Sequence, residues 1–377
     1  MQGRLARKIL RGLWHPGRAI TVLRSLWQLR QGAPGPPASV SVLPTLACNL
    51  RCRMCPQRSA GGSSTPAPTT MLRFEHLTRL LDQVSRSKPS IDLSGGEPTL
   101  HPAFEEIVGE IKRRGHALSL ATNGSRLAEL AERLVAIGVD QVLVSLDGGE
   151  ETNDQNRGEG AFRNATAGIA ELIAARARRG LATPRITLVA TVTDVSHGSL
   201  SEVADLGLAL GVDGLILSHL RWYTDEVMRA QARATREHLS ECFDPAGLEA
   251  YTRSLETTRQ PTGGPVDPGT LLREIRRIGE TLAGRIPFVA QPGYDEDEVR
   301  RYYSAIDYRR PAGDVCRAVF RYATLTATGD FAFCMGYSAG NVETTTLDEV
   351  WRAPRTRHFF KTVYRLGRFP MCHRCCN

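Results

Sequence analysis

Apolar and polar positions along residues 40–220 repeat in one order: a short β-rich run, then a longer stretch with helical spacing. The six β-rich runs are VSVLPTL (40–46), SIDLS (90–94), ALSLAT (117–122), QVLVSLD (141–147), RITLVATV (185–192) and GLILSHL (214–220). The apolar spacing between them predicts helices at 74–87, 102–114, 126–137, 161–179 and 198–210. Such alternation is typical of parallel β-α-β units, in which helices cover a sheet.

Six such units in about 180 residues predict an α/β fold, either a barrel or a partial barrel. In these folds the chemistry lies at the carboxyl ends of the strands. This rule selects the loops after the first four predicted strands, which we expect to lie together at one end of the barrel. They are residues 48–55, 95–98, 123–124 and 147–149.

The segment before this core, residues 1–39, has helical apolar spacing at 4–14 and 18–30 and ends in a linker, GAPGPPAS (32–39). We expect basic amphipathic helices here. One interpretation is a cap packed on the next domain, and the other is an interfacial element on acidic lipid.

The segments after the core differ from it. Residues 221–310 are charged and mainly helical, with a helix expected at 270–283 and a strand at 286–290, which predicts an insertion or lid. Residues 311–377 are short-stranded and rich in cysteine. There we expect a β-hairpin that turns at Gly329-Asp330 and a helix from 347 to about 361.

The 377-residue chain is 41% hydrophobic and 23% charged, which is typical of a soluble globular protein. No run approaches the ~18 apolar residues of a membrane span. The basic N-terminus lacks an apolar core followed by a small-residue cleavage site, so we expect no secretory signal. A cytoplasmic location follows, with peripheral membrane contact as the alternative. Clustered cysteines in that compartment are more often metal ligands than disulfides.

The positive charge is concentrated at the front of the chain. Residues 1–74 contain eleven Lys or Arg and no Asp or Glu. Since the whole chain carries +8, residues 75–377 sum to −3, which is +8 less +11. The sequence shows no RNA or DNA motif and no basic stripe interleaved with aromatics, so nucleic acid is not an expected partner.

Three cysteines lie in one loop, CNLRCRMC, at positions 48, 52 and 55. A structural zinc site usually has four ligands, so a zinc interpretation needs a distant fourth residue. A cubane iron–sulfur cluster binds thiolates at its irons, and three cysteines would leave one iron open to a ligand that is not protein.

The C-x3-C-x2-C loop after the first strand, with GGEP (95–98) after the second, resembles the signature of the radical S-adenosylmethionine (SAM) enzymes. The resemblance implies a partial (β/α)6 barrel over residues 40–220. It also implies a [4Fe-4S] cluster on Cys48, Cys52 and Cys55, whose open iron binds the amino and carboxylate groups of SAM. The family usually has an aromatic residue before the third cysteine, where this chain has Met54.

The same resemblance implies further contacts to SAM. Gly95, Gly96 and Glu97 would hold its amino group, with glycines that let the backbone approach closely. Ser145 would contact the ribose or carboxylate, and Arg157 would pair with the carboxylate, a role that suits a guanidinium. Asn123 is a further candidate. The alternative interpretation of Ser145 is an ordinary strand-end residue. For Arg157 it is a solvated charge, and for Asn123 a turn residue.

A second cysteine set closes the chain. It resembles the front part of the SPASM domain and its shortened twitch form, in which four cysteines ligate one auxiliary [4Fe-4S] cluster. The implied ligands are Cys316, Cys334, Cys372 and Cys375. The GN…L-x-E-x-W stretch at 340–351 supports the likeness. The alternative is a four-cysteine zinc site.

Two cysteines remain. Cys376 adjoins a predicted ligand and is an alternative to Cys375. Cys242 lies in the predicted lid and is interpreted either as a buried thiol or as a hydrogen-atom donor in catalysis.

The resemblance implies reductive cleavage of SAM to a 5′-deoxyadenosyl radical, which takes a hydrogen from the substrate. An auxiliary cluster that accepts a second electron would make the enzyme an oxidoreductase, and a flavodoxin- or ferredoxin-type protein would supply the first electron. The expected substrate is a small polyol, sugar or aminoglycoside-like molecule. The alternatives are a ribosomal peptide, an epimerisation that uses Cys242, a lipid-linked substrate, or an electron-transfer protein that is not an enzyme.

Overall fold

The computed structural model describes residues 33–55, 70–257, 265–305, 308–310, 316–334 and 337–375. The helices predicted at 4–14 and 18–30 lie outside these residues, and so does Cys376. No helix within the described ranges is both long enough and apolar enough to cross a membrane.

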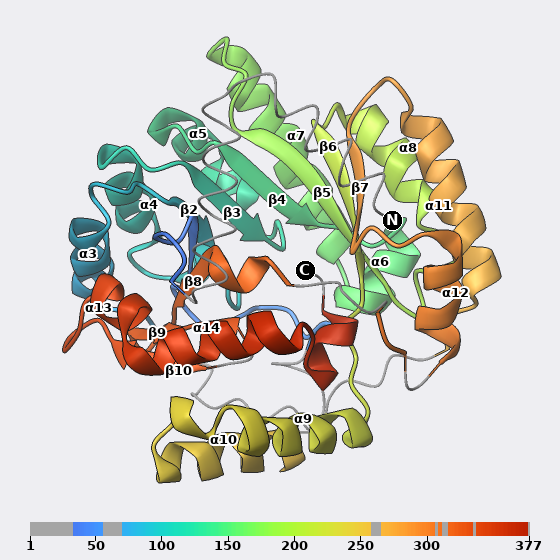
Figure 1. The fold of residues 1–377 in the computed structure, drawn as a ribbon. Coiled ribbons are helices and arrows are strands. Elements are labelled where there is room, and N and C mark those ends of the chain that lie inside the picture. The colour runs from blue at the N-terminus through green and yellow to red at the C-terminus, as the bar shows by residue number, and fades with distance from the viewer. Residues whose placement is uncertain are drawn as a thin grey trace, which may run out of the picture.

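One sheet organises the fold, and its strands follow the order β10-β9-β8-β1-β2-β3-β4-β5-β6-β7 (Figure 1). Neighbours from β8 through β1 to β7 are parallel. The parallel strands are β1 (Ser39–Val42), β2 (Ser90–Leu93), β3 (Leu118–Thr122), β4 (Gln141–Ser145), β5 (Arg185–Val192), β6 (Gly214–His219), β7 (Phe288–Gln291) and β8 (Tyr322–Leu325). All six strands predicted for the core are confirmed, each within a few residues of its expected bounds.

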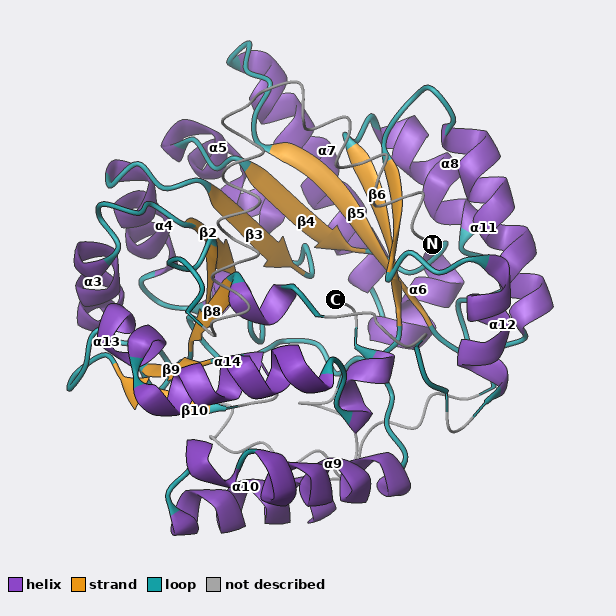
Figure 2. Ribbon diagram, in the orientation of Figure 1, coloured by secondary structure: helices purple, strands orange, loops and turns teal. Residues whose placement is uncertain are grey.

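Helices lie along the outer side of this curved sheet (Figure 2). They are α3 (Phe74–Gln83), α4 (Phe104–Arg113), α5 (Leu127–Ile137), α7 (Ala161–Arg178), α8 (Ser201–Leu210) and α11 (Pro268–Leu282). Helix α3 shows why they pack there. Its Leu77, Leu80 and Leu81 recur at helical spacing and are fully buried, so burial of this one face stabilises the helix against the sheet.

Helix α6 (Glu150–Arg157) was not predicted. It is short and polar, so it lacks the apolar stripe that reveals a helix in a sequence. Helix α12 (Glu296–Ser304) lies in the region expected to be mainly helical, and its Val299 and Tyr302 are buried at helical spacing. The region predicted as an insertion supplies β7, α11, α12 and two further helices, α9 (Asp225–His238) and α10 (Pro245–Thr257).

The C-terminal region continues the same sheet. Strand β8 lies beside β1, with Val40 paired to Ala323, and β9 (Asp330–Ala332) turns back at Gly329 as predicted. Strand β10 (Ser338–Asn341) was not predicted. The helix expected from 347 to 361 is divided into α13 (Leu347–Arg352) and α14 (Pro354–Leu366), because Pro354 lacks the N–H that would continue α13.

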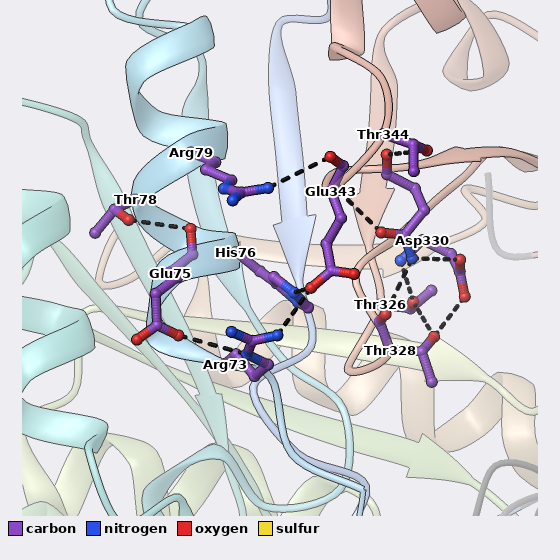
Figure 3. Close-up of polar contacts among 11 residues, drawn as sticks. Arg73, Glu75, His76, Thr78, Arg79, Thr326, Thr328, Asp330, Glu343 and Thr344 are labelled. Atoms are coloured by element: carbon purple, nitrogen blue, oxygen red, sulfur yellow. Dashed lines mark hydrogen bonds and ion pairs between the residues drawn. The ribbon is translucent and has the colours of Figure 1, made fainter.

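A polar cluster joins α3 to the loop after β10 (Figure 3). Oε1 of Glu343 lies 2.8 Å from Nε2 of His76 and 2.9 Å from Nη1 of Arg73. Arg79 donates to the Glu343 backbone carbonyl at 3.4 Å. The C-terminal region is therefore attached to the first helix of the core as well as to its first strand.

Candidate active site

One cavity of about 720 Å³ lies at the carboxyl ends of the parallel strands. All six residues predicted to contact SAM line it, and so do six of the seven predicted cysteine ligands, all except Cys316. The lining residues from these two groups are Cys48, Cys52, Cys55, Gly95, Gly96, Glu97, Asn123, Ser145, Arg157, Cys334, Cys372 and Cys375. The fold thus brings the two cysteine sets, which are far apart in sequence, to one space.

The first cysteine loop follows β1 and is held by its own turn and by α6. The N–H of Cys55 donates to the Cys52 carbonyl at 3.1 Å, and the N–H of Arg53 donates to the Asn156 carbonyl at 2.9 Å. Burial raises the pKa of the Cys52 thiol to about 11, against the lowering effect of nearby Arg157. Without a bound cation the thiol stays protonated, whereas a metal that coordinates it would deprotonate it.

The two glycines of GGEP lie directly against the backbone of the cysteine loop. Gly95 has φ +124°, and a Cβ built on it would lie 2.6 Å from the Thr45 carbonyl oxygen. A Cβ on Gly96 would lie 2.1 Å from the Ala47 carbonyl oxygen. The N–H of Gly96 donates to Thr45 and that of Glu97 to Ala47, at 3.0 and 2.7 Å. These positions therefore need glycine for chain packing, apart from any bound SAM.

The Glu97 carboxylate is buried and fully engaged with protein donors. Oε1 accepts from the backbone N–H and the hydroxyl of Thr99, at 3.2 and 2.7 Å, and from the Thr122 hydroxyl at 2.8 Å. Oε2 accepts from the N–H of Asn123 at 2.7 Å. Burial raises the pKa of this carboxyl. Glu97 thus links the end of β2 to the end of β3, and its predicted contact to the SAM amino group stays a prediction.

Asn123 connects that network to the cysteine loop. Its Nδ2 donates to Oδ1 of Asn49 at 2.8 Å and lies 3.9 Å from Sγ of Cys48. Its Oδ1 accepts from the N–H of Ser125 at 2.9 Å. The amide therefore faces the loop as well as forming the turn, and the two interpretations of Asn123 are compatible.

Arg157 is not a solvated charge. Its Nη2 donates to Oδ1 of Asp147 at 2.8 Å, and its side chain lies against Cys52. Nε of Arg157 is buried without a hydrogen-bond partner among the described residues, and so is Oδ2 of Asp147. Ser145, at the end of β4, is half-buried on the same wall. Of Arg157 and Asp147, Arg157 lines the cavity, and a buried polar atom without a protein partner indicates a polar ligand or water.

Three residues of the second cysteine set, Cys334, Cys372 and Cys375, line the same cavity. Cys316 and Cys372 are buried, and Cys334 and Cys375 are half-buried. The N–H of Cys375 donates to the Cys372 carbonyl at 3.3 Å, which closes the turn between them. Burial raises the pKa of Cys372 to about 11, with further raising from nearby Cys375 and Cys316.

His219, the last residue of β6, lines the same cavity and was missed by sequence reasoning. Its Nδ1 lies 2.8 Å from the Tyr303 hydroxyl, while its Nε2 is buried with no partner in the described part of the chain. Burial lowers its pKa to about 4, so the imidazole is neutral at neutral pH. The sequence does contain an indication of this placement, because His219 lies at the carboxyl end of a predicted strand, where such folds carry their functional residues.

Cys242 is placed elsewhere. It is buried in a second cavity, where its Sγ donates to the Arg355 carbonyl at 3.6 Å, and it does not line the first cavity. Burial raises its pKa to about 12. This placement favours the buried-thiol interpretation, and the hydrogen-donor role stays a prediction without support from the geometry.

The residues present fit iron–sulfur clusters. Within the described ranges no three His, Cys, Asp or Glu side chains are close enough together to hold one metal ion. A [4Fe-4S] cluster binds each thiolate at a different iron, so its ligands need not converge on one point. Six thiols line one cavity, three from each predicted set, and thiolates are the ligands of such clusters.

Two family models match the chain. One is described as the radical SAM superfamily and covers residues 42–199. The other, SPASM, is described as an iron–sulfur cluster-binding domain and covers residues 316–376. The matched segments contain the two predicted cysteine sets.

Curated relatives match about half of the chain. A tungsten-containing aldehyde ferredoxin oxidoreductase cofactor-modifying protein of Pyrococcus furiosus is 32% identical, over 48% of this chain and 51% of its own length. The pre-heme d1 synthase of Dinoroseobacter shibae is 33% identical, over 51% of this chain and 45% of its own length. The mycofactocin maturase MftC of Mycobacterium tuberculosis is 34% identical, over 44% of this chain and 41% of its own length. The chain thus spans about half or less of these relatives.

The fold is similar to that of a solved structure. The Streptococcus suis SuiB structure bound to SAM superposes with a TM-score of 0.60 at 13% identity, over 95% of this chain and 77% of that one. A radical SAM domain implies a [4Fe-4S] cluster and SAM, and the C-terminal domain implies an auxiliary cluster. By its cysteine loop, its sheet and both matched segments, the chain contains a radical SAM superfamily domain over residues 42–199 and a SPASM iron–sulfur cluster-binding domain over residues 316–376.

Proposed function

We propose that this protein is a radical SAM enzyme that oxidises its substrate between two iron–sulfur clusters. The observation that carries the proposal is that residues of both cysteine sets, all except Cys316, line one cavity together with the GGEP glycines and Arg157. In this proposal Cys48, Cys52 and Cys55 hold the first cluster. Cys316, Cys334, Cys372 and Cys375 hold the second. When bound, the first cluster with SAM supplies the 5′-deoxyadenosyl radical that removes a substrate hydrogen.

The chain's own residues position SAM. Nε of Arg157 is buried beside Cys52 and has no hydrogen-bond partner among the described residues, so this guanidinium would pair with the carboxylate of bound SAM. Ser145 and Asn123 present polar groups on the same wall. Gly95 and Gly96 let the GGEP turn pack directly on the backbone at Thr45 and Ala47, which places this turn at the cavity wall beside the cysteine loop.

The predicted SAM contacts and three residues of the second cysteine set line the same cavity, together with His219, Arg221 and Tyr223. A substrate held there would lie between the two clusters, and the second cluster would accept the electron left by hydrogen removal. This arrangement supports a two-electron oxidation. A flavodoxin- or ferredoxin-type protein is the proposed source of the first electron.

For the substrate we propose a peptide or a cofactor precursor. The three relatives described above are named a cofactor-modifying protein, a heme synthase and a maturase, and none is named for a sugar. The expectation of a small polyol therefore has no support from the comparisons. The cavity's volume, about 720 Å³, is within the range of sites that enclose drug-sized molecules.

The decisive experiment is anaerobic incubation of the reduced, cluster-loaded protein with SAM. We expect 5′-deoxyadenosine and methionine above the background of a Cys52→Ala variant. That variant lacks one iron ligand of the first cluster and retains the second set. Absence of product from the loaded protein would leave an electron-transfer role as the better explanation.

A further inference from the structure

Helix α14 carries a stripe of positive charge on its outer face. Arg357, Lys361 and Arg365 follow one another at intervals of four residues, so they lie on one side of the helix, and all three are exposed. The opposite side is apolar and anchors the helix, since Phe359 and Phe360 are fully buried. The helix lies along the outer side of the C-terminal region, with α13 at one end (Figure 1). The stripe therefore faces away from the protein.

No carboxylate follows the stripe along the chain. Residues 350–377 contain seven Lys or Arg and no Asp or Glu. The ion pairs near the beginning of α14 involve other cations, His358 with Glu241 at 3.3 Å and Arg352 with Asp348 at 2.7 Å. None of the three stripe residues forms an ion pair with the described part of the chain. Like charges four residues apart destabilise a helix, so the stripe does not serve the fold.

The stripe ends close to the predicted ligands of the second cluster. Leu366, the last residue of α14, comes six residues before Cys372, so their Cα atoms lie at most about 20 Å apart. The segment between them is held in place. The N–H of Cys372 donates to the Phe369 carbonyl at 2.8 Å, and that of Met371 donates to Oε1 of Gln231 on α9 at 3.2 Å. A protein bound on the stripe would lie beside the second cluster.

An apolar side chain adjoins the cations. Leu366, next to Arg365, is 40% exposed. The 13-residue helix is about 20 Å long, which suits a small interface better than a large permanent one. Electron-transfer partners form interfaces of this small class, below about 1,200 Å², and complementary charge steers their encounter.

We propose that the exposed face of α14 binds an acidic one-electron carrier of the flavodoxin type, which removes the electron from the second cluster. This inference rests on the proposed function, in which substrate oxidation leaves one electron on that cluster. The reduced cluster passes this electron to the oxidised flavin. The flavin also takes one proton from water and becomes the neutral semiquinone.

Acidic lipid is the competing partner for a basic helix. A helix that lies in a membrane surface inserts an apolar face below its basic one. The apolar face of α14 is buried in the protein, where it includes Phe359, Phe360 and Val363. The geometry thus favours a protein partner that is bound by charge.

Binding is measured on the cluster-loaded full chain without SAM, with purified, oxidised flavodoxin as the probe. Changing Arg357, Lys361 and Arg365 together to Gln should raise the Kd about tenfold at low ionic strength, because three exposed ion pairs are lost. The difference should shrink between ~0.01 M and ~0.15 M salt, where the Debye length falls from about 30 to about 8 Å. Gln has a helix propensity close to that of Arg and Lys, so α14 should stay folded.

The matched control changes three other exposed arginines to Gln. Arg86, Arg185 and Arg285 lie at or just before the amino ends of β2, β5 and β7, at the end of the sheet away from the cavity. The change in net charge is the same, and the Kd for flavodoxin should not change. Unfolding in urea checks that both triple variants are folded.

Electron transfer gives a second readout. The chain is reduced with dithionite, freed of it, and mixed with sub-saturating oxidised flavodoxin, and the semiquinone absorbance is followed. The rate should fall about tenfold in the stripe variant, in proportion to the weaker binding, and stay unchanged in the control. With Cys372 and Cys375 both changed to Ala, flavodoxin should still bind, but the rate should fall at least tenfold.

Three results would overturn the proposal. They are an equal Kd in the stripe and control variants, an undiminished rate without the second cluster, and loss of binding to phosphatidylserine vesicles in the stripe variant while flavodoxin binding stays intact. The last result would assign the stripe to lipid. Because no SAM is present, these outcomes are separate from the 5′-deoxyadenosine assay. Failure of that assay alone would leave the docking result in place.

Discussion

Arg157 and Asp147 form a buried ion pair at the wall of the main cavity, with Nη2 of the arginine 2.8 Å from Oδ1 of the aspartate. The same oxygen accepts the N–H of Thr191 at 2.8 Å, so the pair ties the ends of β4, β5 and α6 together. Arg157 reaches Cys52 from this anchor. The residue assigned to a SAM contact is therefore also part of the framework.

Replacing Asp147 by Ala should destabilise the fold by about 3–5 kcal/mol, because it leaves a buried guanidinium without its counter-charge. The free energy of unfolding in urea measures this cost. Arg163→Ala is the control, since its pair with Glu150 at 3.2 Å is exposed and should contribute less than about 1 kcal/mol. Equal losses of unfolding free energy in the two variants would show that the buried pair stabilises the fold no more than the exposed pair does.

Gly96→Ala should prevent the cysteine loop from closing, because the added Cβ would lie 2.1 Å from the Ala47 carbonyl oxygen. We expect iron bound at the first cluster to fall while iron at the second remains. Gly109→Ala provides the control, since its Cβ would meet nothing within 4 Å inside α4. That variant should gain up to about 1 kcal/mol of stability from helix propensity. Normal iron content in Gly96→Ala would contradict the packing argument.

The core strands and the main site could be predicted because periodicity and motif coincide there. Each predicted strand ends at a loop whose residues line the cavity, from Cys48 to Ser145. Partners distant in sequence could not be predicted. Nothing in the sequence places Asp147 against Arg157, turns the Glu97 carboxylate onto Thr122, or separates Cys242 from the site. These relationships depend on how strands and helices pack, which local patterns do not encode.

The pKa of His219 predicts a pH-dependent stability. It falls from 6.5 to about 4 on folding, since burial disfavours the charged imidazole. The folded state therefore binds fewer protons than the unfolded state between these values, and stability is lost as pH falls from about 6.5 towards 4. The loss attributable to His219 should be roughly 3 kcal/mol. Urea unfolding of the wild type and of His219→Gln across this range measures it, and identical slopes would contradict the assignment.

Changing Cys372 and Cys375 together to Ala should remove only the second cluster. Iron should fall from about eight to about four per chain, because each [4Fe-4S] cluster holds four. Iron and sulfide quantitation, with zinc measured in parallel, checks the result. Cys242→Ala is the matched control, since it removes a buried cysteine from the second cavity and should leave iron unchanged. About four irons and one zinc in the unaltered chain would identify the C-terminal site as a zinc site.

Gly329→Ala tests the attachment of the C-terminal hairpin to α3. Gly329 has φ +84°, and a Cβ there would lie 2.7 Å from Nδ1 of His76, whose other nitrogen is held by Glu343 at 2.8 Å. Gly138 has the same φ of +84° with nothing within 4 Å, so Gly138→Ala isolates the backbone penalty, about 1 kcal/mol.

Gly329→Ala should lower the free energy of unfolding by about 1–3 kcal/mol more than Gly138→Ala, because the buried His76 imidazole cannot move far from the added methyl group. Adding His76→Ala removes the clash, so the double variant should be more stable than the sum of the two single effects. Urea unfolding of the four proteins gives the coupling energy. If the two changes in unfolding free energy are additive, the His76 side chain moves aside without cost. The contact between hairpin and helix then does not depend on the close fit of Gly329 and His76.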